Sequence, residues 1–260
     1  MRIALGIEYD GTRFSGWQTQ RHARAIQPLV EHALSKVADA PVKVVCAGRT
    51  DAGVHACCQV VHFDTHAERT MRAWTLGANA HLPEDVSVRW ARPVSDHFNA
   101  RFSALARAYR YVIANRPTRA AIWAHKVTWE CRALDAERMA RAAASLLGEH
   151  DFSSFRAAGC QAHHPVRTLR RISVVRDGEL VVIDVEANAF LHHMVRNIVG
   201  VLLEIGRGER PVEWMSELLA ARDRARGGMT APPGGLYFMR VEYPREFEFP
   251  TVDWLRPPGV

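Results

Sequence analysis

Cysteine is scarce in this sequence, and its number and spacing exclude two common uses of the residue. The chain has five cysteines, an odd number, and two of them, Cys57 and Cys58, are adjacent. A disulfide framework uses paired cysteines, and a zinc knuckle uses CxxC pairs, which the sequence lacks. We therefore expect reduced thiols in an intracellular protein.

Long hydrophobic runs are also missing. No window approaches the run of about 20 apolar residues that a membrane-spanning helix needs. The apolar run near the start, Ile3 to Ile7, ends at Glu8, so it has the length of a β-strand rather than that of a secretory signal. These absences predict a cytoplasmic protein without a membrane segment.

Acidic residues are absent from three stretches of a chain whose net charge is +6. The stretches are 11–30, 97–129 and 152–176, and the second carries six basic residues among six aromatic ones. Cations bind phosphates and aromatic rings stack on bases, so this combination favours a nucleic-acid partner. For any one stretch, the alternative is a solvated strand face above buried aromatic residues.

Residue patterns predict an α+β protein. Segments rich in Val, Ile or aromatic residues and bounded by turns predict strands, whereas apolar residues that repeat about every 3.6 positions predict helices. The order strand-helix-strand-strand-helix-strand occupies the first 95 residues and recurs less regularly from residue 108. We expect two ferredoxin-like (split βαβ) lobes, residues 1–107 and 108–260, with a mainly antiparallel sheet and a basic cleft between them. The predicted strands are 2–9, 42–47, 57–64, 86–94, 108–114, 169–176, 180–187 and 236–243, and the predicted helices are 26–38, 69–80, 135–147, 190–205 and 212–221.

The most informative segment is the string AGRTDAGVHA at residues 47–56, which connects two predicted strands. Its glycines, Gly48 and Gly53, let the backbone turn tightly and approach a ligand closely. An Asp in an arbitrary glycine-rich loop is usually a turn former, because its side chain bonds to nearby backbone N–H groups. The specificity of the whole string outweighs that interpretation for Asp51.

The string is similar to the signature of the tRNA pseudouridine synthase A family, and the resemblance covers most of the chain. Two departures concern loops: Phe14 stands where the family often has Tyr, and residues 229–235 (MTAPPGG) are richer in Pro and Gly. Further matching segments are EYDG (8–11), GWQ (16–18), RFSA (101–104), YRY (109–111), DFSSF (151–155), FLHHMVRN (190–197) and GLY (235–237).

The resemblance implies roles for four residues. Asp51 corresponds to the catalytic carboxylate of the family, and Tyr109 corresponds to its uracil-stacking Tyr. Arg196 corresponds to its active-site Arg, and Arg49 to the Arg that helps to extrude the target base. The implied partner is tRNA, modified at uridines 38, 39 and 40 of the anticodon stem-loop, and the implied assembly is a homodimer.

The implied reaction is an isomerisation that needs a carboxylate. The N-glycosidic bond of uridine breaks, the uracil turns, and C5 reattaches to the ribose. Nothing is oxidised, hydrolysed or added, so we expect no cofactor. Asp51 could attack the base, attack the sugar or abstract a sugar proton, and each route requires a carboxylate held close to the nucleotide.

The predicted helix 190–205 supports a site independently of the family. Most of its surface is apolar, and only a narrow face is polar. Because Arg196 lies on that narrow face, we expect its side chain to point into a cleft rather than into solvent. Adjacent residues on a helix point about 100° apart, so His192 and His193 would make a poor chelate, and we expect no metal site. The polar face consists of His193, Arg196, Asn197 and Gly200.

Two other functions compete with the isomerase. A non-catalytic RNA-binding protein with two RRM-like lobes would carry an RNP1-like aromatic strand, which the sequence lacks. A metal-dependent nuclease would need a second acid beside Asp51, and none lies nearby in the sequence.

Overall fold

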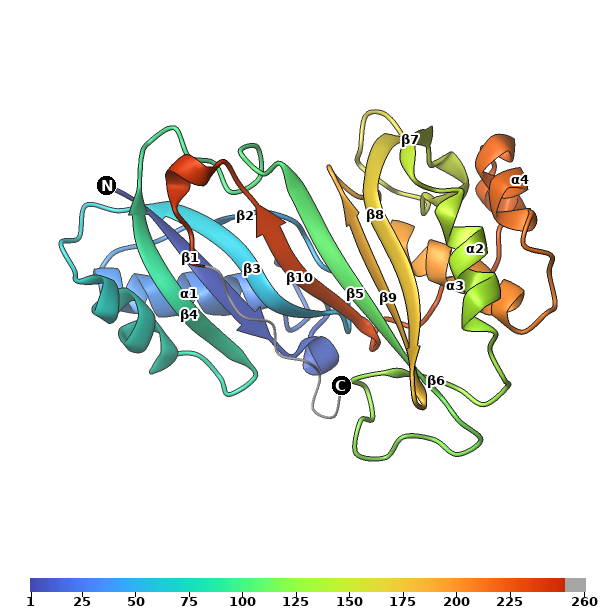
Figure 1. The fold of residues 1–260 in the computed structure, drawn as a ribbon. Coiled ribbons are helices and arrows are strands. Elements are labelled where there is room, and N and C mark those ends of the chain that lie inside the picture. The colour runs from blue at the N-terminus through green and yellow to red at the C-terminus, as the bar shows by residue number, and fades with distance from the viewer. Residues whose placement is uncertain (251–260) are drawn as a thin grey trace. The chain divides into compact units, whose positions relative to one another are not determined.

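The structure is a computed structural model that describes residues 1–250 and contains, within them, ten mainly antiparallel strands together with helices (Figure 1). The chain forms two compact units. The first holds Met1–Leu105 and the chain from Tyr237 onward, and the second holds Ala106–Leu236. The predicted α+β class with a mainly antiparallel sheet is confirmed.

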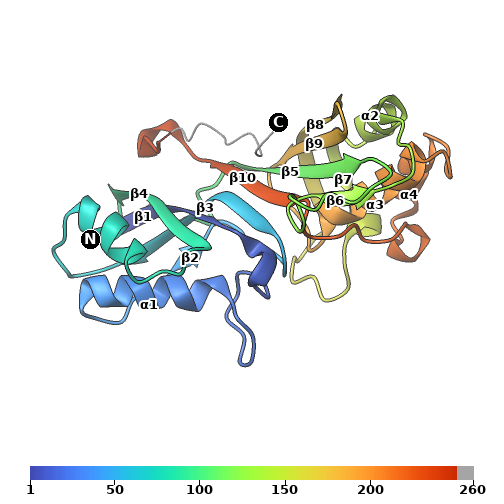
Figure 2. The same cartoon turned by 90° about the horizontal axis from the view of Figure 1, so that it is seen from below.

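The first unit is a β-sheet with one long helix. Its elements are β1 (Arg2–Tyr9), α1 (Ile26–Ala38), β2 (Val45–Cys46), β3 (His55–Asp64), β4 (Val86–Val94) and β10 (Leu236–Glu242), with 3₁₀ turns at Gly11–Arg13 and Arg245–Phe247. The strands follow the order β4-β1-β3-β10, and β2 pairs with β3. β1 is antiparallel to both of its neighbours, whereas β10 runs parallel to β3. Helix α1 covers one face of this sheet (Figure 2).

The core of the first unit forms because α1 and the strands carry apolar residues at matching periods. Along β1, Ile3, Leu5 and Ile7 are fully buried and share one face of the strand. Along α1, Ile26, Val30 and Leu34 lie one turn apart and are also fully buried. The other face of β1 is covered too, because a Cβ on Gly6 would lie 2.1 Å from the Trp90 indole nitrogen.

The second unit is an antiparallel sheet packed against helices. Its elements are β5 (Ala106–Asn115), β6 (Thr128–Glu130), α2 (Ala136–Ala144), β7 (Gly148–Asp151), β8 (Val166–Asp177), β9 (Leu180–Ala187), α3 (Met194–Gly206) and α4 (Trp214–Ala221), with 3₁₀ turns at Ser153–Phe155 and Arg224–Arg226. The strands follow the order β5-β9-β8-β7, and β6 runs parallel to β5. Helix α2 packs against β8 and α3. Gly178, at φ +56°, turns the chain between β8 and β9.

Several predicted elements have the observed bounds, and others need correction. The strands 2–9, 86–94 and 180–187 and the helix 26–38 are confirmed. The strand expected at 42–47 is only Val45–Cys46, and β6 and β7 were not predicted.

Two helices also differ from their predictions. The helix expected at 69–80 contains a π turn at Ala73–Gly77. The helix expected to begin at residue 190 begins at Met194, because His193 has a left-handed backbone with φ 59° that ends the preceding turn.

No helix within residues 1–250 combines the length and the apolar character needed to cross a membrane.

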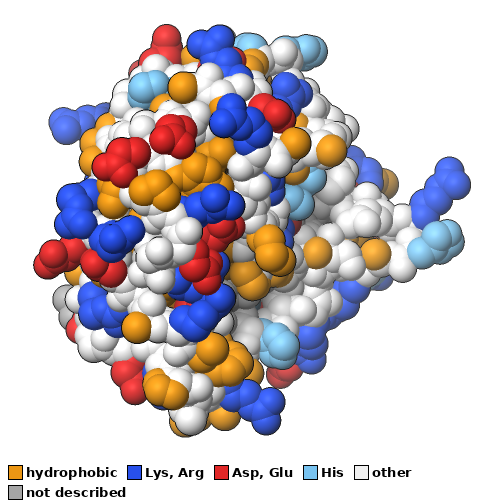
Figure 3. Space-filling view, turned by 90° about the vertical axis from the view of Figure 1, so that its right-hand side faces the viewer, with side chains coloured by type: hydrophobic (Ala, Val, Ile, Leu, Met, Phe, Trp, Pro, Cys, Tyr) orange, Lys and Arg blue, Asp and Glu red, His pale blue; other side chains and the backbone are white. Residues whose placement is uncertain are grey.

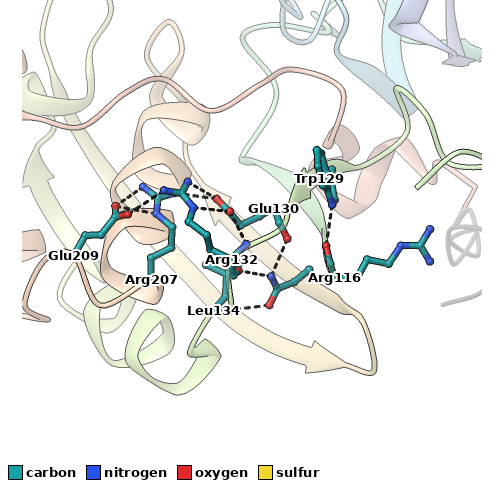
Figure 4. A network of polar contacts seen from close by, with 8 residues as sticks. Arg116, Trp129, Glu130, Arg132, Leu134, Arg207 and Glu209 are labelled. Atoms are coloured by element: carbon teal, nitrogen blue, oxygen red, sulfur yellow. Dashed lines mark hydrogen bonds and ion pairs between the residues drawn. The ribbon is translucent and has the colours of Figure 1, made fainter. Parts of the chain in front are cut away.

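A network of ion pairs joins the end of β6 to the end of α3 in the second unit (Figure 4). The Glu130 carboxylate, which is largely buried, accepts hydrogen bonds from Arg132 at 2.9 Å and from Arg207 at 3.1 Å. Glu209 pairs in turn with both arginines. Burial alone would raise the pKa of Glu130, but the hydrogen bonds from Arg132 and Arg207 outweigh it and the pKa is lowered.

We expect Glu130→Gln to lower the free energy of unfolding at pH 7 by roughly 2 kcal/mol, because Arg207 loses a buried partner. A carboxyl group whose pKa is lowered by folding stabilises the fold above its unfolded pKa, about 4.5, and the contribution disappears as the pH falls through the folded value. The difference between variant and wild type in urea unfolding should therefore vanish in acid.

The control for this prediction is Glu179→Gln. Glu179 pairs with Arg116 at 2.9 Å, but its side chain is 61% exposed, so its loss should change the unfolding free energy by less than about 0.5 kcal/mol. Equal effects of the two substitutions would show that the network contributes no more than a surface pair.

Candidate active site

The loop that carries Asp51 lies between β2 and β3 in the first unit and is fixed at its start by the buried strand β3. The Ala47 N–H donates to the Val60 carbonyl at 2.8 Å. The side-chain amide of Gln59, which is fully buried, bonds to both the N–H and the carbonyl of Gly48. The loop therefore leaves the sheet in one fixed direction.

The segment between β1 and α1 holds the loop on either side of Asp51. The Trp17 N–H donates to the Thr50 carbonyl at 3.0 Å, and the Gly53 N–H donates to the Phe14 carbonyl at 3.1 Å. The buried Thr50 hydroxyl bonds to the Tyr9 hydroxyl at 2.8 Å. Asp51 itself is half-buried and its neighbour Arg49 is exposed, so the loop presents both side chains while its backbone is held.

Two glycines make this contact between backbones possible. A Cβ on Gly11 would lie 2.0 Å from the Val54 carbonyl oxygen, and a Cβ on Gly16 would lie 2.7 Å from the Thr50 carbonyl oxygen. Gly16 also has φ +98°, a conformation that L residues rarely adopt. The EYDG and GWQ motifs therefore support the loop through the backbone, a role that the sequence alone did not reveal.

Phe14, the residue marked as a departure by the sequence resemblance, lies in the same support. The Phe14 ring is buried and the Arg24 guanidinium lies over it, 4.2 Å from the ring centroid. Arg24 is held there by two hydrogen bonds to Asp85, at 2.9 and 3.1 Å. A ring that packs in this way keeps its place without a hydroxyl group.

His55 and Tyr237 form a second support, at the start of β3 and β10. The Gly11 N–H donates to His55 Nδ1 at 3.0 Å, and an Asp10 carboxylate oxygen lies 3.1 Å from the same nitrogen. The His55 ring stacks on Tyr237 with centroids 4.7 Å apart, and burial is the main reason that the pKa of Tyr237 is raised. His55 and Tyr237 both belong to segments that match the family, AGRTDAGVHA and GLY, but the sequence alone indicated no role for either residue.

Tyr109 lies in the second unit, on β5, opposite Val185 of β9. Its ring meets the Phe190 ring edge to face, with centroids 5.0 Å apart and an interplanar angle of 83°. Tyr109 is half-buried, and Phe190 precedes α3. This contact fixes the orientation of the Tyr109 ring.

Arg196 lies in the first turn of α3 and is tied to the neighbouring irregular segment around Ala231. Its Nε donates to the Ala231 carbonyl at 2.8 Å, and the Ala231 N–H donates back to the Arg196 carbonyl at 3.1 Å. The Tyr111 hydroxyl bonds to Thr128 and to the Pro232 carbonyl nearby. Burial raises the pKa of Tyr111, although the charge of Arg196 acts in the opposite direction.

The other predicted members of the polar face of α3 serve as structural supports. Asn197, which is buried, donates to the Phe155 carbonyl at 2.8 Å and accepts from the Thr230 hydroxyl at 2.7 Å. A Cβ on Gly200 would lie 1.7 Å from the Met229 carbonyl oxygen. The face predicted to border a cleft is therefore occupied, at these two positions, by the 229–231 segment and the DFSSF motif.

The reasoning that placed His192 and His193 on a helix was wrong. Both residues precede α3, and the left-handed backbone of His193 brings the two rings to a centroid distance of 4.0 Å. Their separation therefore cannot be argued from helical geometry.

The acid-free stretches of the sequence are not free of acids in space. Arg110 forms two hydrogen bonds to Asp184, at 2.8 and 2.9 Å, and Arg24 pairs with Asp85 as described. On the face of the molecule shown in Figure 3, basic and acidic side chains are interspersed. Counting cations along the sequence therefore overstates the number that can bind phosphate.

Comparison with known proteins gives consistent matches. A family model described as tRNA pseudouridine synthase matches residues 6–103 and 142–244. A tRNA pseudouridine synthase A from Pseudomonas aeruginosa is 60% identical over 250 residues, which cover 96% of this chain and 88% of the relative. One from Methylococcus capsulatus is 60% identical over 95% of this chain and 91% of its own length. One from Hydrogenovibrio crunogenus is 57% identical over 96% and 95%.

The support of the Asp51 loop leads to a test at Gly16. We expect Gly16→Ala to lower the rate of uridine isomerisation about tenfold, because the new Cβ would displace Thr50 and move Asp51 from its position. The rate would be measured as single-turnover release of tritium from C5-labelled uridine in tRNA.

Gly208→Ala is the matched control. Gly208 also has a positive φ, +76°, but a Cβ there would meet no atom within 4 Å. It therefore carries the backbone strain without the collision. Equal losses of activity in the two variants would contradict the loop-support model.

Proposed function

This chain belongs to the tRNA pseudouridine synthase A family and isomerises uridine to pseudouridine in tRNA, and we propose that Asp51 is its catalytic carboxylate. The observation that carries the proposal is the loop itself. Hydrogen bonds hold the backbone at Thr50 and Gly53, while the Asp51 side chain between them is half-exposed. A carboxylate held in this way can meet a nucleotide with little loss of freedom.

We propose that three other residues act on the same nucleotide. Arg49, exposed two positions before Asp51, helps to extrude the target base, which must leave its stack before it can react. Tyr109 holds the uracil by stacking while the glycosidic bond is broken. Arg196 lies beside the nucleotide and keeps the Asp51 carboxylate ionised and oriented.

The proposed reaction needs no redox partner and no energy donor. The N1–C1′ bond breaks, the uracil turns and C5 bonds to C1′; C5 then loses its proton to solvent and N1 takes up one proton, so the product is an isomer of the substrate. Attack of Asp51 on the base, attack on the sugar and abstraction of a sugar proton all begin with the ionised carboxylate. The freed uracil must be kept from water throughout, which is why an aromatic platform is required.

We propose that the targets are uridines 38, 39 and 40 of the anticodon stem-loop, and that the enzyme acts in the cytoplasm as a homodimer. The matching motifs support these assignments, and sedimentation of the purified protein would measure its assembly directly. Family membership decides against a non-catalytic RNA-binding protein and against a nuclease.

We expect Asp51→Asn to abolish isomerisation and to leave tRNA binding within about twofold of wild type. Asn is nearly isosteric with Asp and can form the same turn, so the loop should survive. It cannot act as a nucleophile or a base, whereas affinity comes mainly from cations that contact many phosphates. Substrates with tritiated uridine at only one of the three positions would test targets and carboxylate together.

Filter binding of the same variant is the control for folding and affinity. Substantial tritium release by the Asn variant would show that Asp51 is a turn residue. Release by wild type from none of the three positions would refute the target assignment alone.

We expect Tyr109→Leu to lose activity by roughly tenfold to a hundredfold, because stacking of a base on an aromatic ring contributes about 1–3 kcal/mol. Tyr109→Phe keeps the ring and its contact with Phe190, so it should retain more activity than the Leu variant. A Phe variant that cleaves the glycosidic bond but releases tritium slowly would assign the hydroxyl to the later proton transfer. Near-wild-type turnover by both variants would remove Tyr109 from the site.

A further inference from the structure

One aromatic side chain of the acid-free stretch 97–129 is largely exposed in the first unit. Phe102 is 79% exposed, whereas Phe98, four positions earlier, is fully buried. An exposed phenylalanine forgoes the favourable transfer of its ring out of water. A single exposed apolar residue is nevertheless common on protein surfaces, so exposure alone assigns Phe102 no function.

The turn that carries Phe102 is closed by side-chain hydrogen bonds. The Asn99 Oδ1 atom accepts from the backbone N–H groups of Arg101 and Phe102, at 2.9 and 3.1 Å. The Ser103 N–H donates to the Asn99 carbonyl at 2.9 Å, and the Asn99 N–H donates to Ser103 Oγ at 3.0 Å. An Asn that bonds to the backbone two residues on stabilises a turn, so the backbone at Phe102 is held in place.

The same turn is anchored to the sheet of the first unit. The N–H of Ala100, which is fully buried, donates to Nδ1 of His62 on β3 at 3.0 Å. Burial is the main reason that the pKa of His62 is lowered, which favours the neutral ring that can accept this bond. The Ala100 carbonyl accepts from the Tyr243 hydroxyl at 2.6 Å. Phe102 therefore projects into solvent from a support that is fixed to the core.

A guanidinium group lies over the exposed ring. The Arg101 Cζ atom is 5.4 Å from the centroid of the Phe102 ring, which is within the range of a cation–π contact. This contact restricts the orientation of the ring, and the 79% exposure leaves most of the ring surface open to solvent. An aromatic ring with an arginine beside it is the combination that binds bases of single-stranded RNA.

The turn lies close to the start of the proposed catalytic loop. His62, which anchors the turn, is the register partner of Val45 on β2, and the loop leaves β2 after Cys46. Burial raises the pKa of Cys46 to about 11, whereas the charges of Arg49 and Arg101 both act to lower it. The two arginines are therefore within electrostatic reach of the same thiol.

We propose that Phe102 is a stacking platform for an unpaired base of the tRNA close to the target nucleotide. The inference rests on the proposed function, which assigns Arg49 to extrusion of the target base. Extrusion takes a stacking partner away from the bases nearby, and an aromatic ring on a fixed turn replaces it. Phe102 is a positioning residue, which holds the RNA strand and contacts no reacting atom.

The test compares variants of Phe102 in binding to a fluorescently labelled tRNA transcript, measured by anisotropy. Phe102→Leu removes the ring but keeps an apolar side chain, and it should weaken binding about tenfold, because one base is no longer stacked. Phe102→Tyr keeps the ring and should bind within about twofold of wild type. The slope of log affinity against log salt concentration should be unchanged in both variants, because no phosphate contact is removed.

RNAs that lack a single base identify the partner of the ring. Each is an anticodon stem-loop with an abasic nucleotide at one unpaired position. At the position that stacks, loss of the base should weaken binding to wild type about tenfold and binding to Phe102→Leu by less than about twofold, because the two changes remove the same contact. Additive losses at every position would overturn the platform.

Ile122→Ala is the matched control, because Ile122 is 95% exposed and belongs to the same acid-free stretch but carries no ring. Its affinity for tRNA should equal that of wild type. A tenfold loss in this variant too would assign the effect to exposed apolar surface and overturn the stacking platform. Sedimentation of Phe102→Leu tests a second copy of the chain as the partner of the ring, and a changed assembly would also overturn the platform.

The two proposals fail separately. Equal affinities of wild type, Phe102→Leu and Phe102→Tyr, with normal tritium release from the labelled uridines, would remove the platform and leave the function in place. Tritium release by wild type from none of the three positions, with a tenfold loss of tRNA affinity in Phe102→Leu alone, would refute the target assignment and support the platform.

Discussion

The position of Asp51 depends on a contact between two backbones. The bonds from Trp17 to Thr50 and from Gly53 to Phe14 lie on either side of it, and side chains larger than hydrogen at positions 11 and 16 would prevent them. Each such bond contributes about 1 kcal/mol net, but the geometric effect matters more. Because the backbone is held on both sides of Asp51, the main motion that remains to this residue is rotation of its side chain. The reaction requires this of a carboxylate that must meet a nucleotide in one orientation.

The second unit holds Arg196 by a similar arrangement. Reciprocal hydrogen bonds join Arg196 to Ala231, and Gly200 lets the chain approach α3 at Met229. In both units, a glycine permits two segments to approach each other closely through their backbones, at Gly16 beside the Asp51 loop and at Gly200 on α3, and backbone groups then fix the residue proposed to act on RNA. In the MTAPPGG segment, the carbonyls of Ala231 and Pro232 accept hydrogen bonds from Arg196 and Tyr111, and these contacts do not depend on the side chains of the segment.

The regular elements were largely predictable from the sequence, and the supports of the site were not. The spacing of apolar residues located the strand 2–9 and the helix 26–38, because both elements bury their apolar residues in the same core. Periodicity failed at residues 190–193, where apolar spacing continues but the left-handed backbone of His193 ends the pattern. The motif containing Asp51 was found by resemblance, whereas the supporting roles of His55 and Tyr237 depend on contacts between segments far apart in the sequence.

The distribution of charge along the sequence likewise failed to show which cations are already paired in the folded protein. A stretch without acids suggests a phosphate-binding surface, but Arg110 and Arg24 in such stretches find Asp184 and Asp85 through pairing with distant segments. A cation that a carboxylate already neutralises is less able to bind phosphate, and only the fold shows which cations these are. The acid-free pattern became informative only after the fold had identified which of its arginines are already neutralised.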